Sequence, residues 1–315
     1  MKNYLFLSVI LFCLISCKTG PGADRQYEAN NGKRVYKLNL NPTSGSEYEY
    51  EIINESNVNM EVDDKKVDNV SKSEVVVLYT LNKDSAGNFL LSMQYKKVHI
   101  YTKTGETETD INTDNTAATD DPVEKMIGIL KNAAIEATVN PLGEIISVKG
   151  YDEIADKIIS GLNIEDAYTK NIARARWQQA IGEGVIKKNM SQLFKIFPDS
   201  AVHVGDKWKL NSTQDGELGF NIKSFYTLKH MNDEVAVIAS EGEIGGDNAT
   251  INVSGNLVKS NLKGTQEGEY RVELKTGMMS EGEINSKVEG TLQMMGKEIP
   301  ITVKSEVKIK GKKIR

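Results

Sequence analysis

The residue types that most often carry chemistry, cysteine and histidine, are few in this sequence. Its 315 residues include two cysteines, Cys13 and Cys17, and three histidines, His99, His203 and His230. Both cysteines lie near the N-terminus, so the rest of the chain has no thiol for a disulfide or a zinc site. None of the histidines has another ligand residue at metal-binding spacing. The sequence therefore predicts no metal site, no cofactor and no catalytic residue.

One acidic loop has the composition of a cation site. Asp110, Asn112, Asp114 and Asp121 match the first, third, fifth and twelfth positions of a calcium-binding loop. However, Asn115 stands where that loop needs glycine, and no helix precedes the segment. We interpret the segment as a solvated loop, with calcium binding as the alternative.

The N-terminal segment has the features of a secretion signal. Lys2 supplies the positive charge, and a mostly apolar run from Tyr4 to Ile15 follows. This run is too short for a convincing membrane span. We therefore predict that residues 1–16 are a signal peptide and not part of the fold.

The apolar run ends in Leu14-Ile15-Ser16-Cys17. These residues resemble the lipobox of bacterial lipoproteins, in which a small residue precedes the modified cysteine. The resemblance implies cleavage between Ser16 and Cys17 and lipidation of Cys17, with palmitate among the acyl chains. Cys13 fits less well because a bulky residue precedes it, and an ordinary secretory signal is the alternative.

The residues after the cysteine indicate where the anchor lies. Two or three acyl chains on one cysteine make a stable membrane anchor, and residues 17–33 form a polar, flexible tether behind it. In the enterobacterial sorting rule an aspartate after the cysteine retains a lipoprotein in the inner membrane, so Lys18 points to the outer membrane. Residues 18–22 lack the acidic cluster that marks surface export in Bacteroidota lipoproteins. We therefore favour the periplasmic face over the cell surface.

Two further tripeptides resemble the short O-glycosylation signal of Bacteroidota, an aspartate followed by Ser or Thr and an apolar residue: Asp84-Ser85-Ala86 and Asp199-Ser200-Ala201. Both lie in predicted turns, where a modifying enzyme has access. Ser85 and Ser200 are therefore candidate modification sites, with chance matches as the alternative.

Antiparallel strands are predicted at both ends of the folded region, in residues 34–101 and 206–310. In the second region apolar residues recur at every second position, which predicts one buried and one wet face. The same pattern puts Val235 and Val237 together on one face. The final strand has the clearest pattern, with apolar residues at Ile299, Ile301, Val303, Val307 and Ile309.

Residues 102–121 are predicted to be a loop, and residues 122–197 a set of helices interrupted by a hairpin at 137–148 whose turn is residues 140–143. Because the helices lie between two sets of strands, we expect them to cover the apolar face of a single sheet. The predicted fold class is α+β: a large curved antiparallel sheet, a half-barrel-like meander, with a central helical block on its apolar face. Residues 34–315 then form one domain.

Two segments, residues 138–150 and 197–208, resemble an uncharacterised family of outer-membrane lipoproteins from Bacteroidota, a domain of unknown function. The resemblance covers roughly residues 35–310. It implies an outer-membrane lipoprotein of a Gram-negative bacterium, and it implies no activity.

The expected function is structural. A net charge of −5 argues against a nucleic-acid partner. We expect a non-enzymatic structural or accessory envelope protein that contacts the membrane through its lipid anchor and docks on an outer-membrane protein or on envelope polymer. The alternative is a binding module that holds an apolar ligand, an acyl chain or lipid, between sheet and helices. An enzyme is a third hypothesis, although the sequence singles out no pair of carboxylates.

Overall fold

The computed structural model describes residues 35–62, 65–114, 122–131, 133–161, 166–213, 221–253, 256–294 and 296–315. Strand accounts for 63% of the structure and helix for 15%. The predicted antiparallel sheet is confirmed. The predicted α+β class is wrong, because the helices are short and form no central block on the sheet.

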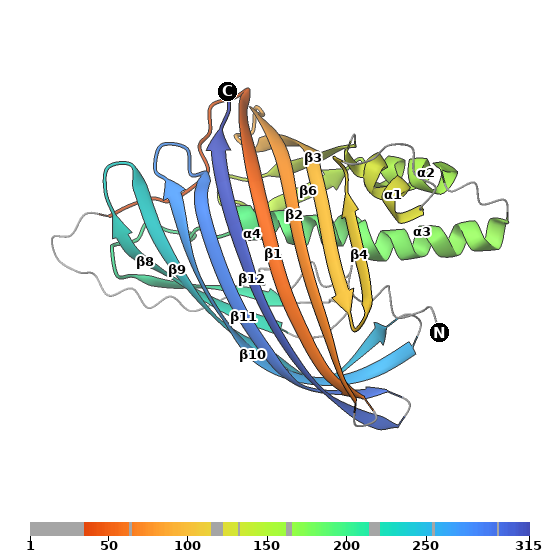
Figure 1. Ribbon diagram of the computed structural model, residues 1–315. Coiled ribbons are helices and arrows are strands. Elements are labelled where there is room, and N and C mark those ends of the chain that lie inside the picture. Colours follow the sequence, from red (N-terminus) through yellow and green to blue (C-terminus); the bar gives the residue numbers. More distant parts are fainter. Residues whose placement is uncertain are drawn as a thin grey trace.

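The strands form one continuous 12-stranded sheet (Figure 1). Its order is β6-β5-β3-β2-β1-β12-β11-β10-β9-β8-β7, and β4 pairs with β3 outside this path. The strands are β1 (Ser46–Val62), β2 (Lys65–Lys83), β3 (Phe89–Thr104), β4 (Thr107–Asn112), β5 (Ala134–Val139), β6 (Ile145–Lys149), β7 (Lys207–Thr213), β8 (Asn221–Met231), β9 (Val235–Val253), β10 (Asn256–Glu273), β11 (Met279–Met294) and β12 (Lys297–Lys313).

The first and last strands pair with each other and join the two halves of the sheet at its centre. β1 and β12 pair antiparallel from Tyr48 opposite Lys313 to Met60 opposite Ile301. On either side of this pair the long strands are joined to their sequence neighbours by antiparallel pairing. The N-terminal and C-terminal strands therefore form one sheet and not two.

The helices are α1 (Pro122–Lys131), α2 (Tyr151–Gly161), α3 (Ala167–Ile181) and α4 (Glu183–Phe194). They contact one another and the strands β3 and β6. In Figure 1, α1, α2 and α3 lie beside one edge of the sheet, whereas α4 lies behind its long strands. Helices therefore form where the sequence predicts them, but they do not form a layer over the sheet. Among the described residues, no helix combines the length and the hydropathy needed to cross a membrane.

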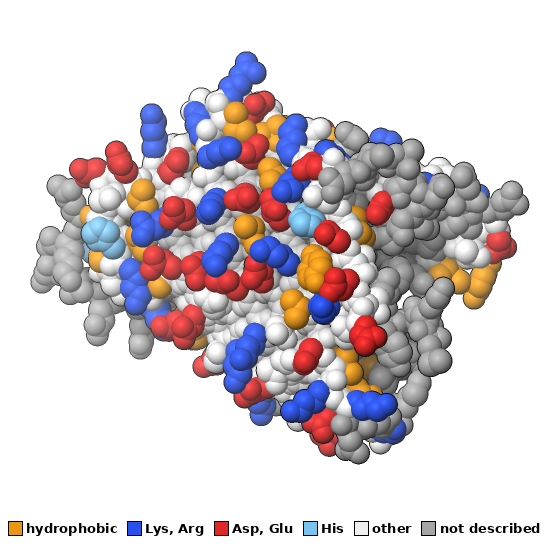
Figure 2. Space-filling view, in the orientation of Figure 1, with side chains coloured by type: hydrophobic (Ala, Val, Ile, Leu, Met, Phe, Trp, Pro, Cys, Tyr) orange, Lys and Arg blue, Asp and Glu red, His pale blue; other side chains and the backbone are white. Residues whose placement is uncertain are grey.

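The sheet is strongly curved, and its outer face is charged. Figure 2 shows acidic and basic side chains interspersed over this face. Cross-strand ion pairs tie neighbouring strands there, with Lys72 2.6 Å from Glu55 and Lys312 2.7 Å from Glu49. Because these side chains are largely exposed, the pairs contribute little to stability.

The inner face is apolar and forms two clusters. The main core takes in side chains from both halves of the sheet and from α2 and α4, including Tyr50, Tyr79, Ile158 and Phe194. A smaller second cluster lies further along the long strands and consists of Val58, Ile222, Ile244, Leu262, Val288, Ile301 and Val303.

The inward-facing residues of β9 differ from those that the sequence pattern indicates. Ala236 and Ile238 are fully buried, whereas Val235 and Val237 are only partly buried. Ala236 and Ile238 therefore occupy the core side of β9, which is paired with β8 on one flank and β10 on the other.

Candidate functional site

The predicted modification sites lie in different places. Ser16 and Cys17 are outside the described residues. Ser85 is exposed in the turn between β2 and β3. Asp84 shapes that turn, because its Oδ1 accepts hydrogen bonds from the backbone N–H groups of Ala86 (2.9 Å) and Asn88 (2.8 Å). Ser200 is partly exposed in the segment between α4 and β7.

The candidate cation ligands do not form a loop. Asp110 and Asn112 belong to β4, which lies inside the segment predicted as a loop, and Asp121 is outside the described residues. Asp110 accepts instead a 2.7 Å contact from Nε2 of His99 on β3. Within the described ranges no three His, Cys, Asp or Glu side chains are placed to share a metal ion.

The first segment that carries the family resemblance packs against the C-terminal end of α4, which leads directly into the second segment. The β5–β6 turn is shaped by Asn140, whose Oδ1 accepts from the backbone N–H groups of Leu142 (3.0 Å) and Glu144 (2.9 Å). Glu144 then pairs with Lys195, at the C-terminal end of α4, across 3.0 Å. This junction fixes the hairpin against α4.

The junction extends to the first strand of the second half. Trp208 on β7 donates a 3.1 Å hydrogen bond from its indole N–H to the carbonyl oxygen of Ile196. Its ring stacks on Tyr226, with centroids 6.0 Å apart. These contacts are structural, because they tie the end of α4 to the β5–β6 hairpin and to β7.

Aromatic rings line the inner face beside α4. Tyr79 makes edge-on contacts with Tyr50 and Phe194, at centroid distances of 5.7 and 5.6 Å. Burial raises the pKa of Tyr50 and Tyr79 well above the ordinary value, so both phenols are neutral at physiological pH. These rings build the core and leave no ionised group on this part of the face.

Further along the strands, strand register places eight small or polar residues in one line across the inner face. We call this line the polar row. Each member lies directly opposite the next in the ladder. From β3 to β8 its members are Thr102, Ser71, Ser56, Ser305, Ser286, Gln266, Gly242 and Ser224.

The polar row separates the two apolar clusters. On one side the adjacent line contains Val58, Val303 and Val288 of the second cluster. On the other side it contains Ile284 and Tyr226 of the main core. An uncharged polar band therefore crosses an otherwise apolar surface.

Several oxygens in and beside the polar row are buried without a hydrogen-bond partner. They are Oγ of Ser56, Ser73, Ser224 and Ser240 and Oε1 of Gln266. All five side chains are at most 4% exposed. Leaving such a group unpaired in the interior costs about 1–3 kcal/mol. The unpaired oxygens of this band therefore lower the stability of the folded chain.

Glycines hold this band tightly packed. A Cβ at position 268 would lie 2.8 Å from Oγ of Ser240, and one at position 242 would lie 3.2 Å from Cβ of Gln266. A side chain at position 268 would displace its neighbours, and one at position 242 would need a small shift of Gln266. Sequence reasoning missed the polar row because its members come from eight strands and align only once the register is known.

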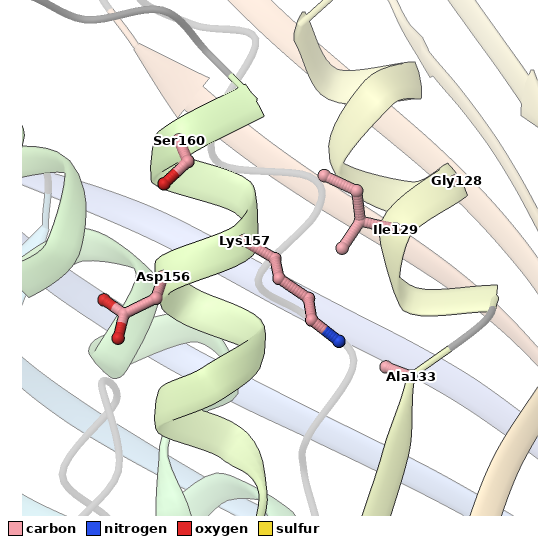
Figure 3. A pocket seen from close by; sticks show the side chains of 6 residues that line it. All are labelled: Gly128, Ile129, Ala133, Asp156, Lys157 and Ser160. Atoms are coloured by element: carbon pink, nitrogen blue, oxygen red, sulfur yellow. The ribbon is translucent and has the colours of Figure 1, made fainter.

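Two surface depressions complete the candidate sites. A cleft of about 620 Å³ lies between α1 and α2, where Lys157 reaches from α2 toward Ile129 and Ala133 (Figure 3). A second, of about 750 Å³, lies across β1, β2 and β10 to β12 and includes Glu55 and Lys304. Both are open to solvent and have mixed polar and apolar linings.

The fold and these sites define a predominantly antiparallel β protein with a curved, largely apolar inner face. Residues 86–279 match the model described as "Family of unknown function (DUF6263)", and the chain belongs to this family. No curated protein matches the chain.

Similarity to solved structures is weak. The translocator domain of autotransporter NalP from Neisseria meningitidis aligns at 6% identity and a TM-score of 0.22, over 86% of this chain and 90% of that chain. The COG4313 outer membrane channel from Pseudomonas putida F1 aligns at 8% identity and a TM-score of 0.25, over 90% of this chain and 100% of that chain. At these TM-scores neither alignment bears on fold or function.

Proposed function

We propose that the protein is an outer-membrane lipoprotein of a Gram-negative bacterium of the Bacteroidota, held at the periplasmic face by acyl chains on Cys17. Its role is structural or accessory and not enzymatic. The observation that carries the proposal is the sequence Leu14-Ile15-Ser16-Cys17 at the end of a short apolar run. The charged outer face, with both signs interspersed, suits contact with a second envelope protein.

Metabolic labelling with an alkyne palmitate tests the anchor. The native chain incorporates the label and fractionates with the outer membrane, and Cys17→Ser loses the label and is not processed. Cys13→Ser is the matched control, because it removes the other cysteine and leaves labelling unchanged. Labelling that survives Cys17→Ser would refute the anchor. Protease added to intact cells distinguishes the two faces, since a periplasmic chain is protected.

Ser85 and Ser200 are proposed O-glycosylation sites on this protein. The exposed turn at Ser85 supports that site in particular. Intact mass measurement of the chain from its native host tests both sites. Ser85→Ala and Ser200→Ala should each remove one glycan mass, and an unmodified native chain excludes both.

A second function, the binding of an apolar ligand, is favoured by the inner face itself. Buried apolar side chains cover it on both sides of the polar row, from Tyr226 and Ile284 to Val58 and Val303. An acyl chain that inserts along this face exchanges its hydration for apolar contacts. Native mass spectrometry of the chain after exposure to phospholipid vesicles tests it, and a stoichiometric lipid adduct is the expected result.

A further inference from the structure

The five unpartnered oxygens specify more than an apolar ligand. We propose that the inner face binds a neutral amphiphile, one with hydroxyl and ester groups beside an acyl chain, and that Ser224, Ser240 and Gln266 recognise its polar part. The inference rests on the proposed binding of an apolar ligand to the same face. It adds which polar groups the ligand carries and which residues bind them.

The three residues lie together on adjacent strands. Gly242 on β9 stands directly opposite both Ser224 on β8 and Gln266 on β10. Ser240 is two residues away from Gly242 on the same face of β9, and its Oγ lies over the bare backbone of Gly268. All three oxygens therefore border one small patch that lacks side chains.

The hydrogen-bonding groups limit the ligand's chemistry. Oε1 of Gln266 only accepts, so its partner must bring an O–H or N–H donor. The serine hydroxyls can donate to an ester or carbonyl oxygen. The polar row contains no charged residue, so a carboxylate or phosphate there would be buried without a counter-charge. A glycerol monoester of a fatty acid satisfies each of these conditions.

The flanking clusters place the acyl chain. Ile222 and Leu262 of the second cluster lie on one side of the patch, and Tyr226 and Ile284 of the main core lie on the other. Because the patch is close-packed, the ligand must separate contacts on the inner face as it enters. Its polar part then supplies the partners that the buried oxygens lack, which favours the opened, occupied state over the closed one.

Photo-crosslinking tests the proposal on the lipidated full chain in phosphatidylcholine vesicles. Three probes share one diazirine-bearing acyl chain: the glycerol monoester, the methyl ester and the free fatty acid. The glycerol monoester should label peptides of β8 to β10 most strongly. The methyl ester lacks the donor for Gln266 and the acid carries a charge, so each should label these peptides at least about fivefold less, the cost of one lost hydrogen bond.

The variants separate recognition from folding. The double variant Ser224→Ala/Ser240→Ala should be labelled by the monoester about tenfold less or lower still. Thermal unfolding of this variant should show no loss of stability, because the removed hydroxyls were unpaired. Gln266→Met should act in the same direction. Ser92→Ala is the matched control, since Ser92 is exposed on the outer side of β3 and should label as the native chain does.

Two results would overturn the inference in distinguishable ways. Equal labelling of the inner-face peptides by all three probes, or native labelling of the double variant, refutes recognition by these residues and leaves apolar binding intact. No labelling of inner-face peptides by any probe refutes the binding function itself, and this inference with it.

Discussion

Nζ of Lys195 lies 3.0 Å from Oε1 of Glu144, and this pair joins the β5–β6 turn to the end of α4. The Lys195 side chain is only 8% exposed, whereas that of Glu144 is 39% exposed. The buried charge therefore depends on a carboxylate at the rim of the structure. The pair fixes the first segment that carries the family resemblance, residues 138–150, against the end of α4, which leads into the second, residues 197–208.

Replacing Glu144 by glutamine should lower the stability of the fold. The change keeps the side chain's shape but removes the negative charge 3.0 Å from the largely buried Lys195 ammonium, so we expect a loss of about 1–3 kcal/mol in the free energy of unfolding. Urea unfolding followed by circular dichroism measures it. Glu136→Gln, at an exposed position of β5, is the control and should change stability by less than about 0.5 kcal/mol. Equal effects of the two changes would contradict a structural role for the pair.

Two glycines with nearly the same backbone conformation should respond very differently to alanine. Gly87 and Gly143 have φ of +87° and +83°. A Cβ at Gly87 meets nothing within 4 Å, whereas one at Gly143 would lie 1.8 Å from the carbonyl oxygen of Phe194. Gly87→Ala should cost about 1 kcal/mol from backbone strain alone, and Gly143→Ala at least about 3 kcal/mol more. Thermal unfolding of the two variants measures the difference, and similar melting temperatures would contradict the close contact.

The strands could be predicted because alternation is a local signal. In β12 four of the five predicted residues, Ile299, Ile301, Val303 and Ile309, are buried, and Val307 is partly buried. The partner of each strand could not be predicted in the same way. β1 and β12 are adjacent although they come from opposite ends of the folded region, and no pattern within either strand specifies that pairing. The polar row depends on the same strand pairing, so it could not be predicted from the sequence.

The fold class was wrong for a different reason. The helix signals in residues 122–197 are genuine, and α1, α2, α3 and α4 lie there. Local periodicity predicts that a helix forms, but it does not predict how much of the sheet that helix covers. The long strands curl and bury the second cluster strand against strand, whereas α2 and α4 pack only on the main core, so no helical layer covers the whole sheet. The β9 face was misassigned because Ala236 is small and gives little apolar signal, although it is fully buried.

Stability should fall at alkaline pH because of the buried tyrosines. Burial raises the pKa of Tyr79 above its ordinary value of about 10, so the folded chain keeps a proton that the unfolded chain releases. The unfolded state then binds fewer protons, and the free energy of unfolding declines as pH rises above about 10.

Removing the phenol should reduce that decline. Tyr79→Phe should make the slope shallower by up to about 1.4 kcal/mol per pH unit between about pH 10 and 11.5. Urea titrations at several pH values give the slope. Tyr168→Phe is the matched control, because the Tyr168 side chain is 74% exposed and its removal should leave the slope unchanged. A native slope in Tyr79→Phe would contradict the buried phenol.

Adjacent residues of β12 should show that this strand is central and has one buried face. Val303 is 3% exposed and stands opposite Val58 on β1 and Val288 on β11. Val303→Lys places an ammonium in the second cluster and should cost at least about 3 kcal/mol or prevent folding. Thr302 points to the outer face, where Thr302→Lys stands opposite Glu289 and should change stability by less than about 0.5 kcal/mol. Comparable losses in both variants would mean that β12 has no single buried face, and the sheet closure between β1 and β12 would have to be reassigned.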